Sequence, residues 1–193
     1  MRDPALDVIC IGRSSVDLYG GQVGGRLEDM SGFSKYIGGS PTNISVGCAR
    51  LGLKSALITR VGDEHMGRFI RETLDGEGVE TSHVITDPAR LTALVILGIR
   101  DSARFPLIFY RENCADMAIS EADIDSDFIA SAKAVLVTGT HSAPTLSPEP
   151  ALRRCAWRAR LAGRWRSISI TGRTSGLLAG TLMAKAALPK ARG

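Results

Sequence analysis

The side chains best suited to chemistry in this sequence follow predicted strands or open a predicted helix. Asp17 comes shortly after an apolar run, and its carboxylate can accept hydrogen bonds from two hydroxyl groups. Asn43 lies just after the adjacent glycines Gly38 and Gly39, and its amide carries both a donor and an acceptor. Arg111 ends a later apolar run and can bind a carboxylate through two parallel hydrogen bonds. In α/β sheets, ligands bind at the carboxyl ends of strands, where polar residues such as these are expected to lie.

The stretch GGSPTNISVGCARLG, residues 38–52, predicts a helix over residues 41–51. Pro41 fits the first turn of a helix, because its missing N–H would have no partner there, and Ser40 is a suitable N-cap. Gly52 is expected to end the helix.

The two glycines before this helix lack a Cβ, so a ligand can approach the backbone closely. The helix N-terminus adds unpaired N–H groups and a partial positive charge, and Asn43 lies in its first turn. Such a site can hold a polyhydroxylated ligand. The spacing alone favours a simpler interpretation, in which the glycines form a tight strand-to-helix turn and Asn43 is a surface residue.

The other candidates also have structural interpretations. Asp17 can be a loop carboxylate that neighbouring backbone groups satisfy. Arg111 can form a surface ion pair, with Glu112 or Asp116 as its partner. Asp63, in the stretch VGDEHMG, is expected to cap the following helix rather than to bind a ligand.

Alternating strand-like and helix-like segments predict an α/β fold with a largely parallel sheet. Short apolar runs predict strands at residues 8–12, 56–61, 79–85 and 134–139. Apolar residues at helical spacing from Met66 to Leu74 predict a helix ending near residues 76–78, and another helix is expected to begin at Ser120.

Two strand-like runs interrupt this alternation. Residues 91–99 and 105–110 flank a polar turn at residues 100–104, which predicts a β-hairpin. Because few helices are left to cover an inserted hairpin, we expect it to project as a lid over a ligand site.

Composition and motifs argue against several classes of protein. The 193 residues suffice for one domain with a sizeable core, no apolar run reaches membrane-span length, and no signal peptide is expected. The histidines are isolated and the four cysteines lie far apart, at positions 10, 48, 114 and 155. These spacings predict neither a zinc site nor a disulfide framework, and they favour a reducing cytoplasm. Walker A, G-x-G-x-x-G and G-x-S-x-G motifs are all absent from the sequence.

The character of the sequence changes near residues 142–150. All 20 acidic residues lie within residues 1–149, whereas residues 150–193 hold ten of the 24 Lys and Arg and no acid. The segment SAPTLSPEP is rich in proline, and residues 167–193 show no clear strand–turn–helix pattern. We therefore expect two kinds of sequence to meet here.

The chain resembles the ribokinase-like PfkB family of carbohydrate kinases over about residues 5–141. The match to the family's first signature rests on Gly38, Gly39, Pro41, Asn43, Ser45, Gly52 and Gly62. Within the family, IGRSSVDLYG, KYIGGSPTN and PLIFYRENCADMAIS are similar to kinases that phosphorylate 5-dehydro-2-deoxy-D-gluconate in inositol breakdown. Kinases of 2-keto-3-deoxygluconate share the acidic substrate and the lid arginine, and they remain an alternative.

The resemblance implies a three-layer α/β/α sandwich with a small β-sheet lid, and transfer of the ATP γ-phosphate to a sugar hydroxyl with Mg²⁺. It implies that sugar hydroxyls are bound by Asp17, Gly38, Gly39 and Asn43. Arg111, in FYREN, is similar to the lid arginine that meets the substrate carboxylate in related kinases. Lids in this family often pair between subunits, so a homo-oligomer formed through the lid is expected.

The sequence departs from the family after about residue 141. The Gly-Ala-Gly-Asp segment, which supplies the general base and the anion hole, does not occur. The fold is therefore expected to be incomplete at the C-terminus, and no catalytic, nucleotide-binding or metal-binding residue is assigned. We expect residues 1–141 to be the N-terminal part of a kinase domain without turnover of its own, and residues 142–193 to be an atypical basic tail. One hypothesis is that the tail results from a frameshift.

A competing hypothesis is a non-catalytic binding protein. The tail interleaves arginines with Trp157 and Trp165, a mixture that can bind nucleic acid or an anionic membrane. We favour an accidental tail, and neither a membrane nor a nucleic-acid partner is expected.

Overall fold

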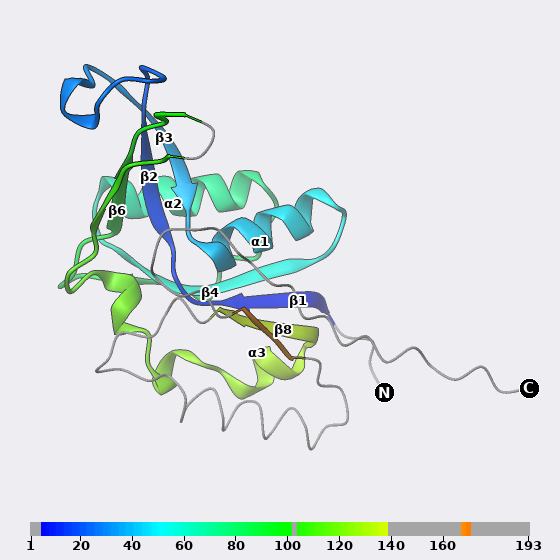
Figure 1. The fold of residues 1–193 in the computed structure, drawn as a ribbon. Coiled ribbons are helices and arrows are strands. Elements are labelled where there is room, and N and C mark those ends of the chain that lie inside the picture. The colour runs from blue at the N-terminus through cyan, green and yellow to red at the C-terminus, as the bar shows by residue number, and fades with distance from the viewer. Residues whose placement is uncertain (1–4, 102–103, 139–166, 171–193) are drawn as a thin grey trace, which may run out of the picture.

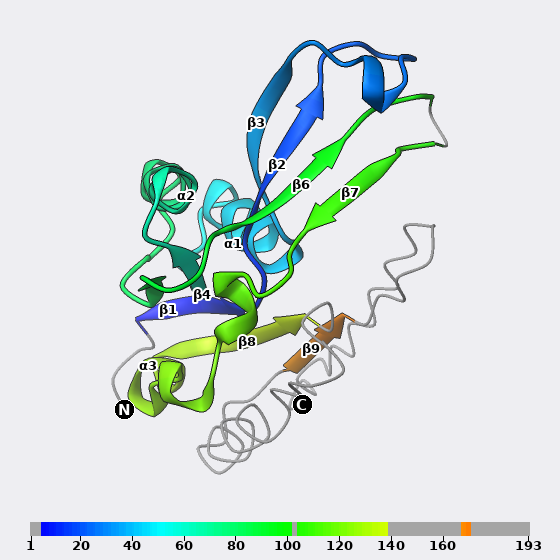
Figure 2. The same cartoon turned by 90° about the vertical axis from the view of Figure 1, so that its left-hand side faces the viewer.

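The computed structural model describes residues 5–101, 104–138 and 167–170 of the chain. These residues form two sheets: a five-stranded parallel sheet, flanked by helices, and a four-stranded mixed sheet that projects from it (Figures 1 and 2). The expected α/β architecture with a small lid is confirmed.

The parallel sheet has the strand order β5-β4-β1-β8-β9. Its strands are β1 (Leu6–Ile11), β4 (Ser55–Gly62), β5 (Val84–Asp87), β8 (Ala132–Thr138) and β9 (Ser167–Ile170). In β1, Ile9 pairs with Ala56 of β4 and with Val135 of β8. Because both faces of β1 are covered, it carries a continuous apolar run rather than an alternating one.

Helices cover both faces of this sheet. Helices α1 (Ser40–Arg50) and α2 (His65–Gly76) lie on one face, and the short α3 (Ser126–Ala130) lies on the other (Figure 1). Cys10 of β1 faces the first cluster, with Ile70 and Leu74 of α2. Ile9 and Ile11 face the second cluster, with Ile129 of α3.

The mixed sheet, called the lid below, has the strand order β3-β2-β6-β7. Its strands are β2 (Ser15–Gly20), β3 (Phe33–Gly38), β6 (Ala93–Leu97) and β7 (Leu107–Tyr110). The antiparallel β6–β7 pair confirms the predicted hairpin, and β2 and β3 form a second one beside it. The hairpins join through a parallel β2–β6 pairing, and the sheet rises from one end of the molecule (Figure 2).

Several predicted boundaries were wrong. Helix α1 starts at Ser40 with Gly39 as its N-cap, so the hydroxyl of Ser40 does not cap it. Glu64, not Asp63, caps α2 and accepts hydrogen bonds from the backbone N–H groups of Met66 and Gly67. A carboxylate immediately before the first turn competes better for these donors than one placed a residue earlier.

Other segments also differ from prediction. The strand expected at residues 79–85 begins only at Val84, because Val79 closes the turn after α2 instead. Ser120 opens a 3₁₀ turn at residues 121–123, and the helix itself begins at Ser126 behind an Asp125 cap.

The C-terminal segment holds an unforeseen strand. Residues 167–170 pair in parallel with β8, Val135 opposite Ser167, so the absence of strand pattern inferred for this stretch was wrong. Most of the tail, including residues 142–150 and the basic and aromatic residues up to 166, lies outside the described residues. Within the described ranges, no helix is long and apolar enough to cross a membrane.

Candidate functional site

The candidate site lies where the lid meets the parallel sheet. Asp17 is on strand β2, not in a loop, and it is opposite Tyr36 of β3. Ser15, two residues earlier on the same face, is opposite Gly38. A Cβ added to Gly38 would lie 2.1 Å from Oδ1 of Asp17. The structure therefore brings together two of the predicted site residues, and the missing side chain of Gly38 makes room for the carboxylate.

The carboxylate of Asp17 is partly buried. Burial raises its pKa above the ordinary value, while a 3.0 Å hydrogen bond from the Ser15 hydroxyl and the charge of Arg13 act in the opposite direction. The side-chain hydroxyl, not the neighbouring backbone, supplies this hydrogen bond. A half-buried carboxylate on a strand is suited to accept hydrogen bonds from the hydroxyl groups of a ligand.

Gly39 has a different role from Gly38. Its φ of 99° and ψ of 131° are open to glycine and costly for other residues. A Cβ here would lie 2.3 Å from the carbonyl oxygen of Arg13, which also accepts a 3.2 Å hydrogen bond from the Thr42 hydroxyl. Gly39 is thus required by the chain's own backbone, where the segment after β1 passes the start of α1.

Asn43 is exposed in the first turn of α1, and its backbone N–H donates to the carbonyl of Gly39. Its side chain lines a hollow of about 470 Å³ between the lid strand β3 and helix α2. Lys35 and Phe69 face each other in this hollow, with the ammonium 3.8 Å from the ring centroid. Asn43 is therefore connected to the two glycines through the start of α1, and its side chain borders this hollow between β3 and α2.

Arg111 directly follows β7 and is held by Asp116. Its Nη2 and Nε lie 2.6 and 2.8 Å from Oδ2 of Asp116, whose side chain is 0% exposed. The ion pair with Asp116 that the sequence left open is therefore present. The pair is not a surface one, because the Arg111 side chain is only 19% exposed. The buried partner fixes the guanidinium at the base of the lid.

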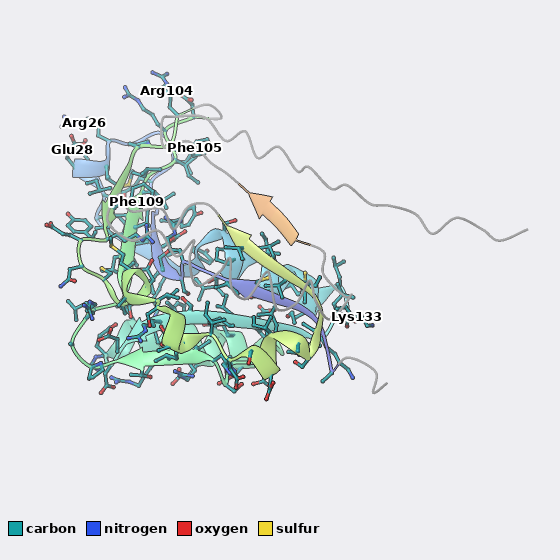
Figure 3. The ribbon with its side chains drawn as sticks, turned by 90° about the horizontal axis from the view of Figure 1, so that it is seen from below. Arg26, Glu28, Arg104, Phe105, Phe109 and Lys133 are labelled. Atoms are coloured by element: carbon teal, nitrogen blue, oxygen red, sulfur yellow. The ribbon has the colours of Figure 1, made fainter. Side chains whose placement is uncertain are left out.

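Arg13 was missed in the sequence analysis. Its guanidinium carbon lies 5.5 Å from the ring centroid of Phe109 on β7, and its Nε is buried. Within the described part of the chain, this Nε has no hydrogen-bond partner. The available signal was its place just after a buried strand, at the carboxyl end of the sheet. Figure 3 shows Phe109 on the stem of the lid, below the tip that carries Arg26, Glu28, Arg104 and Phe105.

Asp63 does not take part in this site. It is exposed, and its backbone N–H donates to the carbonyl of Asp87. Nearby, the side chain of Arg60 binds Asp123 at 2.7 Å and Asp87 at 3.4 Å. These ion pairs hold together the loops at the ends of β4 and β5, which is a structural role.

Comparisons with known proteins agree with this geometry. The model of the pfkB family of carbohydrate kinases matches residues 5–181, which extends past the resemblance seen in the sequence. A 5-dehydro-2-deoxygluconokinase from Geobacillus kaustophilus is 43% identical over 145 residues, 75% of this chain and 43% of that protein. The chain thus spans less than half the length of the curated relative.

Solved structures give the same result for the fold. A PfkB protein from Polaromonas sp. JS666 is 33% identical, with a TM-score of 0.78 over 88% of this chain and 56% of the other. A putative ribokinase II from E. coli, solved in complex with ATP and Mg²⁺, is 18% identical, with a TM-score of 0.74 over 86% of this chain and 52% of the other. The fold is α/β and ribokinase-like, and the chain belongs to the pfkB family of carbohydrate kinases.

Proposed function

We propose that this chain is the sugar-binding part of an ATP-dependent kinase that phosphorylates 5-dehydro-2-deoxy-D-gluconate. The observation that carries the proposal is the Asp17 carboxylate beside Gly38, at the junction of the lid and the parallel sheet. The substrate follows from the relative that is 43% identical and carries that enzyme's name.

In this proposal, each residue contributes one contact to the sugar acid. The Asp17 carboxylate accepts hydrogen bonds from two sugar hydroxyls, and Gly38 lets the sugar lie against the backbone. Asn43 contacts a further hydroxyl from the first turn of α1. Arg111, fixed by Asp116, binds the carboxylate of the substrate.

Among the residues that the structure describes, none is assigned to ATP or Mg²⁺, because the Gly-Ala-Gly-Asp segment of the family is absent from the sequence. We therefore assign no step of phosphoryl transfer to these residues. The chain on its own is expected to bind the sugar acid without turning it over.

The test is a calorimetric titration of the purified 193-residue chain with 5-dehydro-2-deoxy-D-gluconate, alongside an assay of ADP production. Binding should be detected, and Asp17→Asn should weaken it at least tenfold. Glu72→Gln, a change of an exposed carboxylate on α2, should leave it unchanged. A chain that binds no sugar acid would overturn the proposal, and ADP formed in the presence of the acid would overturn the lack of turnover.

The same titration with 2-keto-3-deoxygluconate separates the two substrates. Both acids carry a carboxylate for Arg111, so only their relative affinities distinguish them. We expect tighter binding of the 5-dehydro acid. A preference for the 2-keto acid would assign the chain to the other kinase type.

We also propose that two copies of the chain pair through their lids. Strand β7 is at the edge of the lid, with backbone groups open to pairing, and all four of its residues are exposed. Leu107, Ile108 and Phe109 are each 46–49% exposed, an apolar surface that a second copy would cover. Light scattering should find a dimer, which Ile108→Glu should weaken and Leu51→Glu, at a site exposed elsewhere, should not. A monomer at all concentrations would contradict this.

A further inference from the structure

We propose that Arg13 and Arg111 together form the carboxylate-binding end of the sugar site, with Arg13 setting the preference for acidic over neutral sugars. This inference rests on the proposed function, because it names a sugar acid as the ligand. It adds a residue that the sequence motifs did not single out.

The backbone of Arg13 is fixed. It follows Gly12, at the end of β1, and its carbonyl accepts the hydroxyl of Thr42 at 3.2 Å. The absent side chain of Gly39 lets this carbonyl approach the start of α1. The side chain of Arg13 therefore starts from a defined point between the parallel sheet and the lid.

The guanidinium of Arg13 lies on the face of the lid that carries Asp17. It is placed over the ring of Phe109, and Phe109 is opposite Val95, which is opposite Asp17. Residues directly opposite each other on neighbouring strands point to the same face of a sheet. Phe109, Asp17 and the guanidinium thus share one face, where the sugar would lie.

Arg111 brings a second positive charge to the same place. It is two residues beyond Phe109, just past the end of β7, and Asp116 holds its guanidinium at the base of the lid. Burial lowers the pKa of Arg13, and the neighbouring charge of Arg111 lowers it further. The charges of Asp17 and Asp116 act on this pKa in the opposite direction, so the two carboxylates offset part of the repulsion between the guanidinium groups.

Each of the nearby carboxylates already has one partner within the chain. Asp116 pairs with Arg111, and Asp17 accepts the hydroxyl of Ser15. The Nε of Arg13 is buried and, among the residues described, has no acceptor. Buried N–H groups in native proteins are almost always paired, so this one indicates a partner other than the residues that the structure describes. A ligand carboxylate at the edge of the guanidinium would accept from Nε and a terminal nitrogen at once.

The experiment compares one acid with its neutral counterpart. The wild-type chain and the variants Arg13→Gln and Arg13→Lys are titrated with 5-dehydro-2-deoxy-D-gluconate and with the analogue whose carboxylate is reduced to a primary alcohol. Arg13→Gln should lower the affinity for the acid by roughly 30-fold and that for the alcohol by less than about threefold. Arg13→Lys, which keeps the charge but loses the two-pronged geometry, should fall between. Arg68→Gln, at an exposed position on α2, is the matched control.

A second measurement needs no sugar. The Arg13 Nε–H resonance of the ¹⁵N-labelled chain, assigned with Arg13→Lys, is followed during titration with glycolate, with chloride as the control anion at equal ionic strength. A glycolate-specific shift supports the anion site even if no sugar binds, in which case only the proposed function fails. If the sugar acid binds and Arg13→Gln leaves its affinity unchanged, the inference is overturned while the proposed function stands. No shift with glycolate and no binding of the acid would overturn both.

Discussion

Replacing Gly38 with alanine should remove ligand binding while leaving the chain folded. The new Cβ would lie 2.1–2.3 Å from the carboxylate atoms of Asp17, so that side chain must rotate away. The rotation breaks the hydrogen bond from Ser15 to a charged acceptor, and this together with local overpacking costs about 1–3 kcal/mol of stability. The two hydrogen bonds that the carboxylate is proposed to accept from sugar hydroxyls are also lost. At about 1.5 kcal/mol or more each, their loss weakens binding roughly 100-fold or more.

The neighbouring glycine gives the contrast. In Gly39→Ala the new Cβ would meet the carbonyl of Arg13, which cannot rotate away, and φ of 99° adds strain. Together these cost about 2–6 kcal/mol, enough to unfold a marginal domain. Gly76→Ala, at the end of α2 with open space around it, is the control and should change neither property. Urea unfolding and calorimetry measure both quantities. If Gly38→Ala binds the sugar acid as tightly as wild type, the assigned role of Asp17 is refuted.

Three further predictions concern ionisable groups. Burial raises the pKa of Asp17, so the folded state loses stability as pH rises from 3.8 through the raised pKa. Without ligand, Asp17→Asn should therefore have a higher Tm than wild type at pH 7 and the same Tm near pH 3. A lower Tm of the variant at pH 7 would contradict this. Although burial opposes ionisation, the ion pair with Arg60 holds the pKa of Asp123 below its ordinary value. Asp123→Asn should therefore lower the free energy of unfolding in urea by about 2–3 kcal/mol at neutral pH, and the difference should shrink as pH falls below 3.8. An unchanged urea midpoint at neutral pH would argue against this. Burial, with a smaller effect from Cys48, raises the pKa of Cys10 to about 12. Mass spectrometry after alkylation at pH 8 should therefore find Cys48 modified well before Cys10. Equal rates of modification would disprove the burial argument.

The parallel sheet could be predicted because its strands are locally self-evident. Cys10 and its neighbours form an apolar run buried on both faces, and the run from Ala134 is equally plain. The lid was only half predicted. Strand β3 has four exposed residues at its start, and β2 carries Asp17, so neither shows the apolar pattern that identified β6. Their strand conformation depends on pairing with each other and with β6.

The candidate site, like the fold, could be predicted only in part from the sequence. Asp17 and Gly38 belong to motifs that the sequence shows, but their contact depends on the register of β2 and β3, which no short stretch specifies. Arg13 could not be identified from the sequence because the ring beside it, Phe109, is distant in the chain, on the β6–β7 hairpin. The tight strand-to-helix turn that the spacing favoured is present at Gly39, and the contact of Gly39 with a sugar stays a prediction.

The connections between the lid and the parallel sheet define how the lid can turn. The chain passes between the two sheets after β1, after β3, before β6 and after β7. Three of these crossings contain a residue with positive φ: Gly12 at 139°, Gly39 at 99° and Asn113 at 50°. The strand pairing within the lid joins its four strands into one unit, so any turn of the lid relative to the parallel sheet has to be taken up at these crossings. Asp17 is on the lid and Asn43 is on α1, so a sugar that contacts both would fix the angle between the two sheets.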